Sequence, residues 1–492
     1  MATVNTNDLR VQNARNFVRT LTEEETNTFI FVGGVTPWEN EEQPPTPANN
    51  FKEIYRSHHE MLALSAIRET DVYHLIPKVR WTSGIIYDYY RHDYSPELTS
   101  YQGANNLYNS IFYVINQNND VYVCLFNNYN RTSTVEPQND TNEPFFTSDG
   151  YQWLRMYNIS DQYMKNRATQ NFMPIIFQDS NTRLEEGAVY TVVIDSPGDG
   201  FTRSAEGKSN QIREYYCNIV GDGEGAVARI RIDNGKVARV DVVRPGHGYT
   251  YATVDFVANR TYASLFDLDN QIDGLDPRGN GAFMSTVIIS PPGGWGSDLV
   301  RQFGSVRVGV FSELEFNFDE LLPNTQFRQI GILHNPEISQ TNPSSLIGCY
   351  GVKVSVVDDD NEFKYGEEIR QFINTTDEIG NIIKTNIARG TVVGWDPDLQ
   401  LLRYVQIPEN HTDEDGKVYR FQNNQEIKGQ ETGKVALPDT TFNGSFKGSL
   451  FSEGYAVPEL TPFTGETLYL TNISPVVRQE TQTEKISLVV TY

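Results

Sequence analysis

A glycine-rich motif that recurs at nearly constant spacing constrains the fold of this chain more than any other sequence feature. Two copies, at 193–202 (VIDSPGDGFT) and 240–250 (VDVVRPGHGYT), share a Pro-Gly-x-Gly-aromatic-Thr core. A degraded third copy lies at 287–295 (VIISPPGGW), and the prolines of the three copies are 48 and 47 residues apart. Each copy begins with a β-branched run, so the period predicts repeated β units that pack against each other.

Glycines also cluster between the copies, at 221–225 (GDGEG), and 278–283 (RGNGAF) echoes them. The spacing resembles a phosphate-binding loop only superficially, because such a loop opens a helix after a parallel strand. Here an alternating apolar stretch follows at 226–232 (AVARIRI), which favours a strand. We interpret these residues as turn glycines.

The rest of the chain also favours β structure. Its 492 residues correspond to about three domains, and 12% of them are aromatic, which is typical of strands and not of disorder. Apolar residues at helical spacing predict helices over 7–21 and 50–69. Short apolar runs predict strands at 28–32, 306–311, 327–333, 352–357 and 485–492.

The predicted fold class is therefore mainly β (α+β): a multidomain chain of antiparallel β sheets or sandwiches with a few short helices and an inserted β-repeat module. Composition shifts and turn signals predict five segments. They are an N-terminal α+β region (1–184), the Gly-rich repeat module (185–300), a core β region (301–345), a second β-rich insertion (346–464) and C-terminal strands that return to the core (465–492).

Charge and hydropathy exclude several classes of protein. Lys and Arg number 40 and Asp and Glu 64, a net charge of −24 that repels phosphate backbones, so we expect no nucleic-acid partner. No run of 18 apolar residues is free of charge, and the first residues lack a basic and apolar signal sequence. We expect a soluble protein assembled in the cytoplasm, without membrane insertion. Its three cysteines are far apart and predict neither disulfides nor a zinc site.

No pattern predicts catalysis, a metal or a cofactor. The acidic clusters at 267–269, 358–362 and 413–416 lack the ligand number or the turn glycine of a calcium loop, so we interpret them as solvated turns. His58, His59 and Glu60 do not have metal-site spacing. A carboxylate pair of the glycosidase type stays open, because a chain with 64 acids contains many pairs. We predict a protein that is not an enzyme.

Read in order, several segments resemble the baseplate wedge protein encoded by gene eight in T-even-type contractile-tailed bacteriophages. They frame roughly 27–180, 305–340 and 465–492, whereas 185–300 and much of 345–460 have no counterpart in that family. The segments are 29–39 (FIFVGGVTPWE) with the Pro-rich 40–47, 75–81 (LIPKVRW), 120–126 (DVYVCLF), 148–153 (SDGYQW), 326–330 (QFRQI) with Asn335-Pro336, and 467–470 (TLYL) with Pro475 and 484–486 (EKI).

The resemblance implies a structural subunit of the virion tail baseplate. It implies a homodimer within each of six wedges, in contact with other baseplate wedge proteins and rearranged when the tail contracts. No chemistry comes with this family, so the resemblance implies no catalytic residues, metal or cofactor.

The Pro-rich loop is the predicted protein interface. A Trp beside prolines offers apolar area at a low entropic cost of ordering, and the residues concerned are Pro37, Trp38, Pro44, Pro45 and Pro47. In the competing interpretation Trp38 covers the core of its own chain.

Two further functions stay open. In the first, a tail-associated receptor- or carbohydrate-binding protein, the aromatic residues of the repeat module would stack on sugars. In the second, a secreted polysaccharide hydrolase, the chain would need export and an acid pair, and the absence of a signal sequence argues against it.

Overall fold

A computed structural model describes residues 6–24, 26–177, 184–203, 213–254, 261–262, 275–276, 283–314, 321–338, 340–341, 343–356, 362–423, 425–479 and 482–492. It is mainly β, with 43% of residues in strands and 11% in helices, and its sheets are antiparallel. The predicted fold class is thereby confirmed. No helix in the described ranges is both long and apolar enough to span a membrane.

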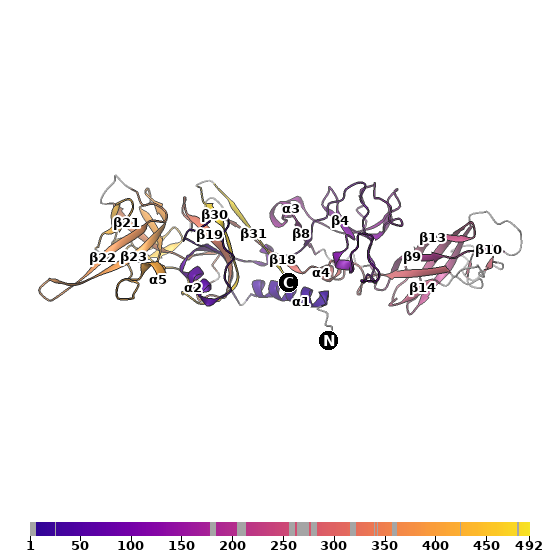
Figure 1. Cartoon of the computed structure of the whole chain (residues 1–492), viewed down its shortest axis with the longest axis horizontal. Helices are drawn as coiled ribbons and strands as arrows, with labels where there is room; N and C mark the ends of the chain where they lie inside the picture. Colours follow the sequence, from indigo (N-terminus) through magenta and orange to yellow (C-terminus); the bar gives the residue numbers. More distant parts are fainter. Residues whose placement is uncertain are drawn as a thin grey trace. The chain divides into compact units, whose positions relative to one another are not determined.

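The chain forms two compact units, and each combines segments that are far apart in the sequence (Figure 1). Unit 1 contains residues 1–15, 73–309 and 490–492, and unit 2 contains 16–72 and 310–489. The boundaries fall inside α1 (Asn7–Thr22), β18 (Arg307–Leu314) and β31 (Glu484–Thr491), and at the start of β3 (Val72–Pro77). The five segments predicted above divide the chain by its sequence and not into compact units. They stay a prediction.

Unit 1 has a core sheet of order β4-β5-β7-β6 and the strand pair β3–β8, with α3 and α4 beside them. Its largest buried side chains include Trp153, Tyr157 and Trp295. The elements are η2 (Leu107–Asn109), β4 (Tyr113–Ile115), β5 (Asp120–Phe126), β6 (Phe145–Phe146), β7 (Gln152–Asn158), α3 (Asp161–Arg167), β8 (Phe172–Pro174) and α4 (Leu299–Gln302).

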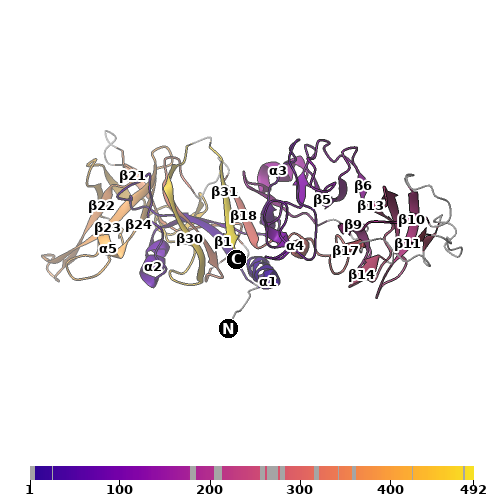
Figure 2. The same ribbon diagram turned by 45° about the vertical axis from the view of Figure 1, so that its right-hand side comes forward.

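The repeat module is the part of unit 1 from β9 to β17 (Figure 2). β9 and β17 pair with each other, and β11 pairs with β12, β14 and β15. The strands are β9 (Val189–Pro197), β10 (Thr202–Arg203), β11 (Arg213–Gly221), β12 (Val227–Asp233), β13 (Lys236–Arg244), β14 (Ala252–Val254), β15 (Thr261–Tyr262), β16 (Leu275–Asp276) and β17 (Phe283–Ile289).

Unit 2 contains a five-stranded sheet of order β20-β2-β1-β19-β30. β1 lies between β2 and β19, and all six of its residues are buried. The elements are β1 (Thr28–Gly33), α2 (Phe51–His59), β2 (Met61–Ala66), η1 (Glu69–Asp71), β19 (Gln326–His334), β20 (Ser345–Ile347) and β30 (Glu466–Val477).

The second part of unit 2 is a closed barrel. Its strands follow the order β24-β23-β22-β25-β26-β21, and a pairing between β21 and β24 closes the ring. Its remaining neighbours include α5 (Pro408–His411), β27 (Gly444–Phe446) and β28 (Ser449–Phe451). The sheet strands are β21 (Tyr350–Val356), β22 (Glu368–Thr376), β23 (Ile382–Asp396), β24 (Leu401–Val405), β25 (Ile427–Gly429), β26 (Val435–Pro438) and β29 (Tyr455–Ala456).

The predicted helix over 50–69 is wrong in its second half. The helix ends at His59, and Met61–Ala66 is strand β2, which pairs with β1. Met61, Leu62 and Ser65 satisfy helical spacing, but a run of apolar residues equally suits a strand with neighbours on both sides. The predicted helix over 7–21 is confirmed, as are the five predicted strands.

Candidate interaction surfaces

The repeat motif is a turn that buries an aromatic ring. In every copy two glycines after the proline have positive φ, a conformation that glycine adopts without steric cost. The aromatic residue that follows is buried: Phe201 is 6% exposed, Tyr249 3% and Trp295 1%. These rings therefore pack in cores and are not a platform for sugar stacking. The glycines are Gly198 and Gly200, Gly246 and Gly248, and Gly293 and Gly294.

Hydrogen bonds hold the second copy in place. The Tyr249 hydroxyl donates to the Ile219 carbonyl oxygen, 3.0 Å away, and accepts from the Ala226 amide at 3.2 Å. One Asp222 carboxylate oxygen accepts from the amides of Thr250 and Tyr251. The Thr250 hydroxyl donates to the other oxygen, and these hydrogen bonds lower the pKa of Asp222 to about 2.

Gly221 ends strand β11, and Gly223 and Gly225 lie in the turn between antiparallel strands β11 and β12, as predicted from the sequence. A Cβ atom on Gly221 would lie 2.0 Å from the Tyr251 carbonyl oxygen, and one on Gly223 would lie 2.4 Å from the His247 carbonyl oxygen. These glycines are needed because the second repeat copy passes directly against them. The echo at 278–282 lies outside the described residues.

A cavity of about 810 Å³ lies beside the second and third copies, lined in part by His92, Glu186, His247 and Ser290. Ser290 is 7% exposed, and its hydroxyl has no hydrogen-bond partner in the described structure. His92 accepts from the Ile289 amide at 3.4 Å, and burial lowers its pKa. The cavity offers hydrogen-bonding groups, but its two tyrosines, Tyr90 and Tyr249, are at most 5% exposed and present no ring face.

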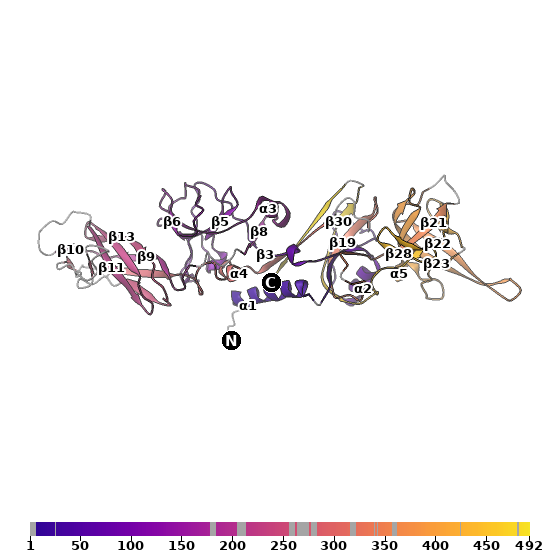
Figure 3. The ribbon, with the colours of Figure 1, turned by 180° about the vertical axis from the view of Figure 1, so that it is seen from behind.

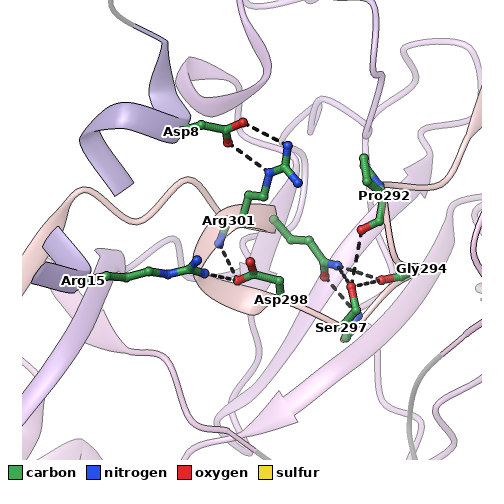
Figure 4. A network of polar contacts seen from close by, with 9 residues as sticks. Asp8, Arg15, Pro292, Gly294, Ser297, Asp298 and Arg301 are labelled. Atoms are coloured by element: carbon green, nitrogen blue, oxygen red, sulfur yellow. Dashed lines mark hydrogen bonds and ion pairs between the residues drawn. The ribbon is translucent and has the colours of Figure 1, made fainter. Parts of the chain in front are cut away.

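A network of polar side chains joins the third copy to α4 and joins α4 to α1 (Figure 4). Arg301 donates to both carboxylate oxygens of Asp8, at 3.0 and 2.9 Å. Asp298 caps α4 by accepting from the Arg301 amide and also binds Arg15. Gln302 donates to the Gly294 carbonyl oxygen at 2.7 Å. The third copy is thus joined to α4 through Gly294, and α4 is joined to α1 through Arg301 and Asp298, all within unit 1.

The predicted interface loop packs on its own chain. The indole nitrogen of Trp38 donates to the Ile473 carbonyl oxygen at 3.1 Å, and the side-chain amide of Asn472 donates to the Pro45 carbonyl oxygen at 2.8 Å. Both acceptor and donor residues belong to β30, an end strand of its sheet in the described structure. Trp38 is half-buried, as are Pro44 and Pro47, while Pro37 and Pro45 are exposed.

Glu60 fixes the start of this loop. Its carboxylate, 2% exposed, accepts from the amides of Val35 and Thr36 at 2.6 and 3.0 Å and from Arg56 at 2.9 Å. The Arg56 guanidinium lies 5.8 Å from the centre of the Trp38 ring. The Glu60 carboxylate therefore holds the backbone at the start of the Pro-rich loop. In the part of the chain that the structure describes, no three His, Cys, Asp or Glu side chains gather as a metal site.

The acidic clusters differ in what the structure shows of them. Residues 267–269 and most of 358–362 lie outside the described ranges. In the third cluster Asp413 accepts from the Ile387 amide at 3.2 Å, and Asp415 binds Lys384 and Tyr419. These carboxylates hold the turn after α5 against the barrel, in agreement with a structural role.

Sequence analysis missed two exposed apolar surfaces, both in unit 2. An aromatic stripe on α2 consists of Phe51, 75% exposed, and Tyr55, 52% exposed, with Phe463 packed edge-on against Tyr55 at 5.4 Å. Phe463 has a φ of 63°, which is rare for an aromatic residue. Neither surface has a sequence signal, because helical and strand periodicity do not tell which apolar residues stay uncovered.

The second surface is the hairpin tip, which we define as residues 374–385 at the end of β22 and β23. The hairpin extends away from the barrel (Figure 3). Three of its isoleucines are exposed: Ile379 by 86%, Ile382 by 59% and Ile383 by 65%.

Comparison of the chain with protein-family models finds no match, and comparison with curated proteins finds none either. The assignment of a function therefore depends on the motif segments and on the surfaces described above.

Proposed function

We propose that this protein is a structural subunit of the baseplate wedge of a contractile phage tail, acting through protein–protein contacts in assembly and in the rearrangement that accompanies contraction. We propose further that it is a homodimer, that it contacts other wedge proteins, and that it is located in the virion. Its role is structural and requires no catalytic residue, metal or cofactor.

One observation carries the proposal. The segments that resemble the gene-eight family are far apart in sequence yet form neighbouring strands. β1 contains the start of 29–39, β19 contains 326–330 and β30 contains 467–470, and β19 pairs with both of the others. In unit 1, β5 (120–126) pairs with β7, which contains the end of 148–153. Segments that share a sheet share the constraints of its core, which supports a common fold for the parts that resemble the family.

The carbohydrate-binding alternative loses its predicted platform, because the three aromatic residues of the repeat are buried. The exposed apolar side chains of unit 2 favour protein contacts instead, since contiguous apolar patches on a surface typically mark interaction sites.

The experiment is a mass measurement by light scattering. The purified chain is measured alone and then mixed with the tail proteins encoded beside it. We expect a dimer that joins a hetero-complex of defined mass. A chain that ignores those proteins and binds host cells or glycans would overturn the proposal.

A further inference from the structure

The hairpin tip is the most exposed cluster of aliphatic side chains on the described surface of unit 2. Single exposed apolar residues are ordinary, but Ile379, Ile382 and Ile383 lie within five residues of one another and are all more than half exposed. A patch of this kind marks a contact site.

Hydrogen bonds hold the backbone of the tip in a defined turn. Asp377 accepts from the amides of Ile379 and Asn381, at 3.0 and 2.8 Å, and from the Asn381 side chain at 3.0 Å. Lys384 binds Asp415 at 3.2 Å. The polar side chains therefore hold the turn together, while the isoleucines contact solvent.

A β-bulge lies within the patch. Thr375 pairs with Lys384 and Thr376 with Ile382, which leaves Ile383 as an extra residue. A bulge changes the direction in which a side chain points. It therefore relaxes the strict alternation that would place Ile382 and Ile383 on opposite faces.

The chemistry of the tip selects a protein partner. Asp377 and Glu378 adjoin the isoleucines, and two carboxylates are repelled by anionic lipid and by nucleic acid. Branched aliphatic side chains offer no ring for a sugar to stack on. An apolar groove on another protein surface fits these side chains best.

Unit 2 itself carries such a groove. A cavity of about 540 Å³ lies between β30 and β31, and most of its lining is apolar: Tyr469, Ile473, Ile486 and Leu488 lie there beside the charged Glu484 and Lys485. β30 is an end strand in the described structure, and residues 467–477 contain no charged side chain. Natural end strands are usually protected by charge, whereas β30 has none over these eleven residues. The Trp38 loop covers its backbone at Asn472 and Ile473, and the cavity lies along its side chains.

We propose that the hairpin tip of one copy of this chain inserts its isoleucines into the β30–β31 groove of a second copy. The two surfaces are complementary in chemistry, and both are present on every copy, so a reciprocal contact closes a two-fold dimer. This contact is the interface of the homodimer in the proposed function, and the inference rests on that homodimer.

Cross-linking between two separately purified variants tests the contact. Ile382→Cys places a thiol on the tip, and Thr471→Cys places one in the groove, which Thr471 lines. The native Cys124, Cys217 and Cys349 are buried, and burial raises the pKa of Cys124 and Cys349, which makes background reaction slow. When the variants are mixed and oxidised, we expect a disulfide-linked species of twice the chain mass.

Each variant oxidised alone is the control, because a tip-to-groove disulfide between copies needs one chain of each kind. A mixture that gives no more linked species than the two controls would overturn the proposal.

A second measurement does not depend on new thiols. Replacing Ile379, Ile382 and Ile383 together by serine is expected to raise the dimer dissociation constant at least about a hundredfold, measured by light scattering over a dilution series. Phe372→Ser is the matched control, since Phe372 is 52% exposed on β22 but outside the tip, and it should leave the constant unchanged. A triple variant that stays folded and dimeric contradicts the proposal.

The same variants separate this inference from the wedge proposal. A chain that joins the tail proteins but is neither dimeric nor cross-linked refutes the tip-to-groove contact alone. A chain that cross-links as expected but joins no tail protein refutes the wedge function alone.

Discussion

The second repeat turn and the hairpin tip are both strand–turn–strand junctions built on glycine with positive φ, yet they treat apolar side chains in opposite ways. In the repeat, Gly246 and Gly248 precede Tyr249, which is 3% exposed. At the tip, Gly380 follows Ile379, which is 86% exposed. Turn chemistry thus sets the path of the backbone, while burial depends on what else packs there.

The space around Gly246 and Gly380 differs in the same way. A Cβ on Gly246 would lie 2.5 Å from the Ala226 amide nitrogen, whereas a Cβ on Gly380 would meet nothing within 4 Å. The repeat turn is surrounded by other backbone segments, and the tip is surrounded by solvent.

The largest effect is expected where a repeat aromatic residue is removed. Trp295→Ala should lower the free energy of unfolding by about 3–5 kcal/mol, because the ring is 1% exposed and packs edge-on against Tyr90 at 4.7 Å. Chemical denaturation followed by tryptophan fluorescence and circular dichroism measures it. Tyr251→Ala, at a residue 66% exposed, is the control and should change stability by less than about 0.5 kcal/mol. An equal loss of stability in the two variants would contradict the distinction between a buried Trp295 and an exposed Tyr251.

Alanine at the two glycines tests the crowding directly. Gly380→Ala should cost about 1–2 kcal/mol for the left-handed backbone alone. Gly246→Ala should cost more, about 2–5 kcal/mol, because the added Cβ also overlaps the backbone of Ala226 and Glu224. Thermal unfolding of both variants measures the difference. A Gly380→Ala variant that is as unstable as Gly246→Ala would show that the tip is packed after all.

The barrel and the repeat module should lose stability in different pH ranges. In the barrel, burial lowers the pKa of His411 to about 4, and its ring accepts from the Ile407 amide at 2.7 Å. The unfolded chain takes up that proton first, so the contribution of His411 to stability is full above about 6.5 and falls as the pH drops toward 4.

In the module the pKa of Asp222 is about 2, so its contribution is full above the unfolded value of about 3.9 and is lost only as the pH falls toward 2. Unfolding of wild type, His411→Asn and Asp222→Asn between pH 7 and pH 2 measures both. Each variant should flatten the pH dependence in its own range, and a variant that leaves its range unchanged would contradict the assignment.

The smallest effect is expected at the tip itself. Ile382→Ser should change the stability of the isolated chain by no more than about 0.5 kcal/mol, because the side chain is 59% exposed. Ile373→Ala on the same hairpin should cost about 2–5 kcal/mol, since Ile373 is 7% exposed. Denaturation at a concentration below that of dimer formation makes the comparison. A large loss at Ile382 would mean that the tip packs within its own chain.

The sequence predicted local structure better than it predicted which distant strands pair. The repeat turns follow from Pro-Gly-x-Gly, because proline and glycine restrict or free the backbone wherever they occur. The barrel was not predicted, since the pairing of β21 with β24 joins residues about fifty positions apart in sequence and no local pattern encodes it. The helix predicted over Met61–Ala66 is wrong for the same reason, because no local pattern encodes the pairing of this segment with β1.

The candidate surfaces were harder still to predict. The Trp38 loop stood out by composition, but its indole donates to Ile473 of its own chain, 435 residues away. In the sequence the isoleucines of the tip resemble part of an ordinary strand. Exposure depends on the assembled fold, and apolar residues occur both in the core and on the surface.

The way the repeat module is attached has a consequence for how such a chain can change over generations. Its first and last strands, β9 and β17, pair with each other from Val189 and Ile289 onward, and Ser290 donates its amide to Ala188. Entry and exit are therefore adjacent. A coding segment with adjacent ends can be gained or lost in a single recombination event that leaves the remaining reading frame able to fold, so a lineage can vary the size of this protein without redesigning its core.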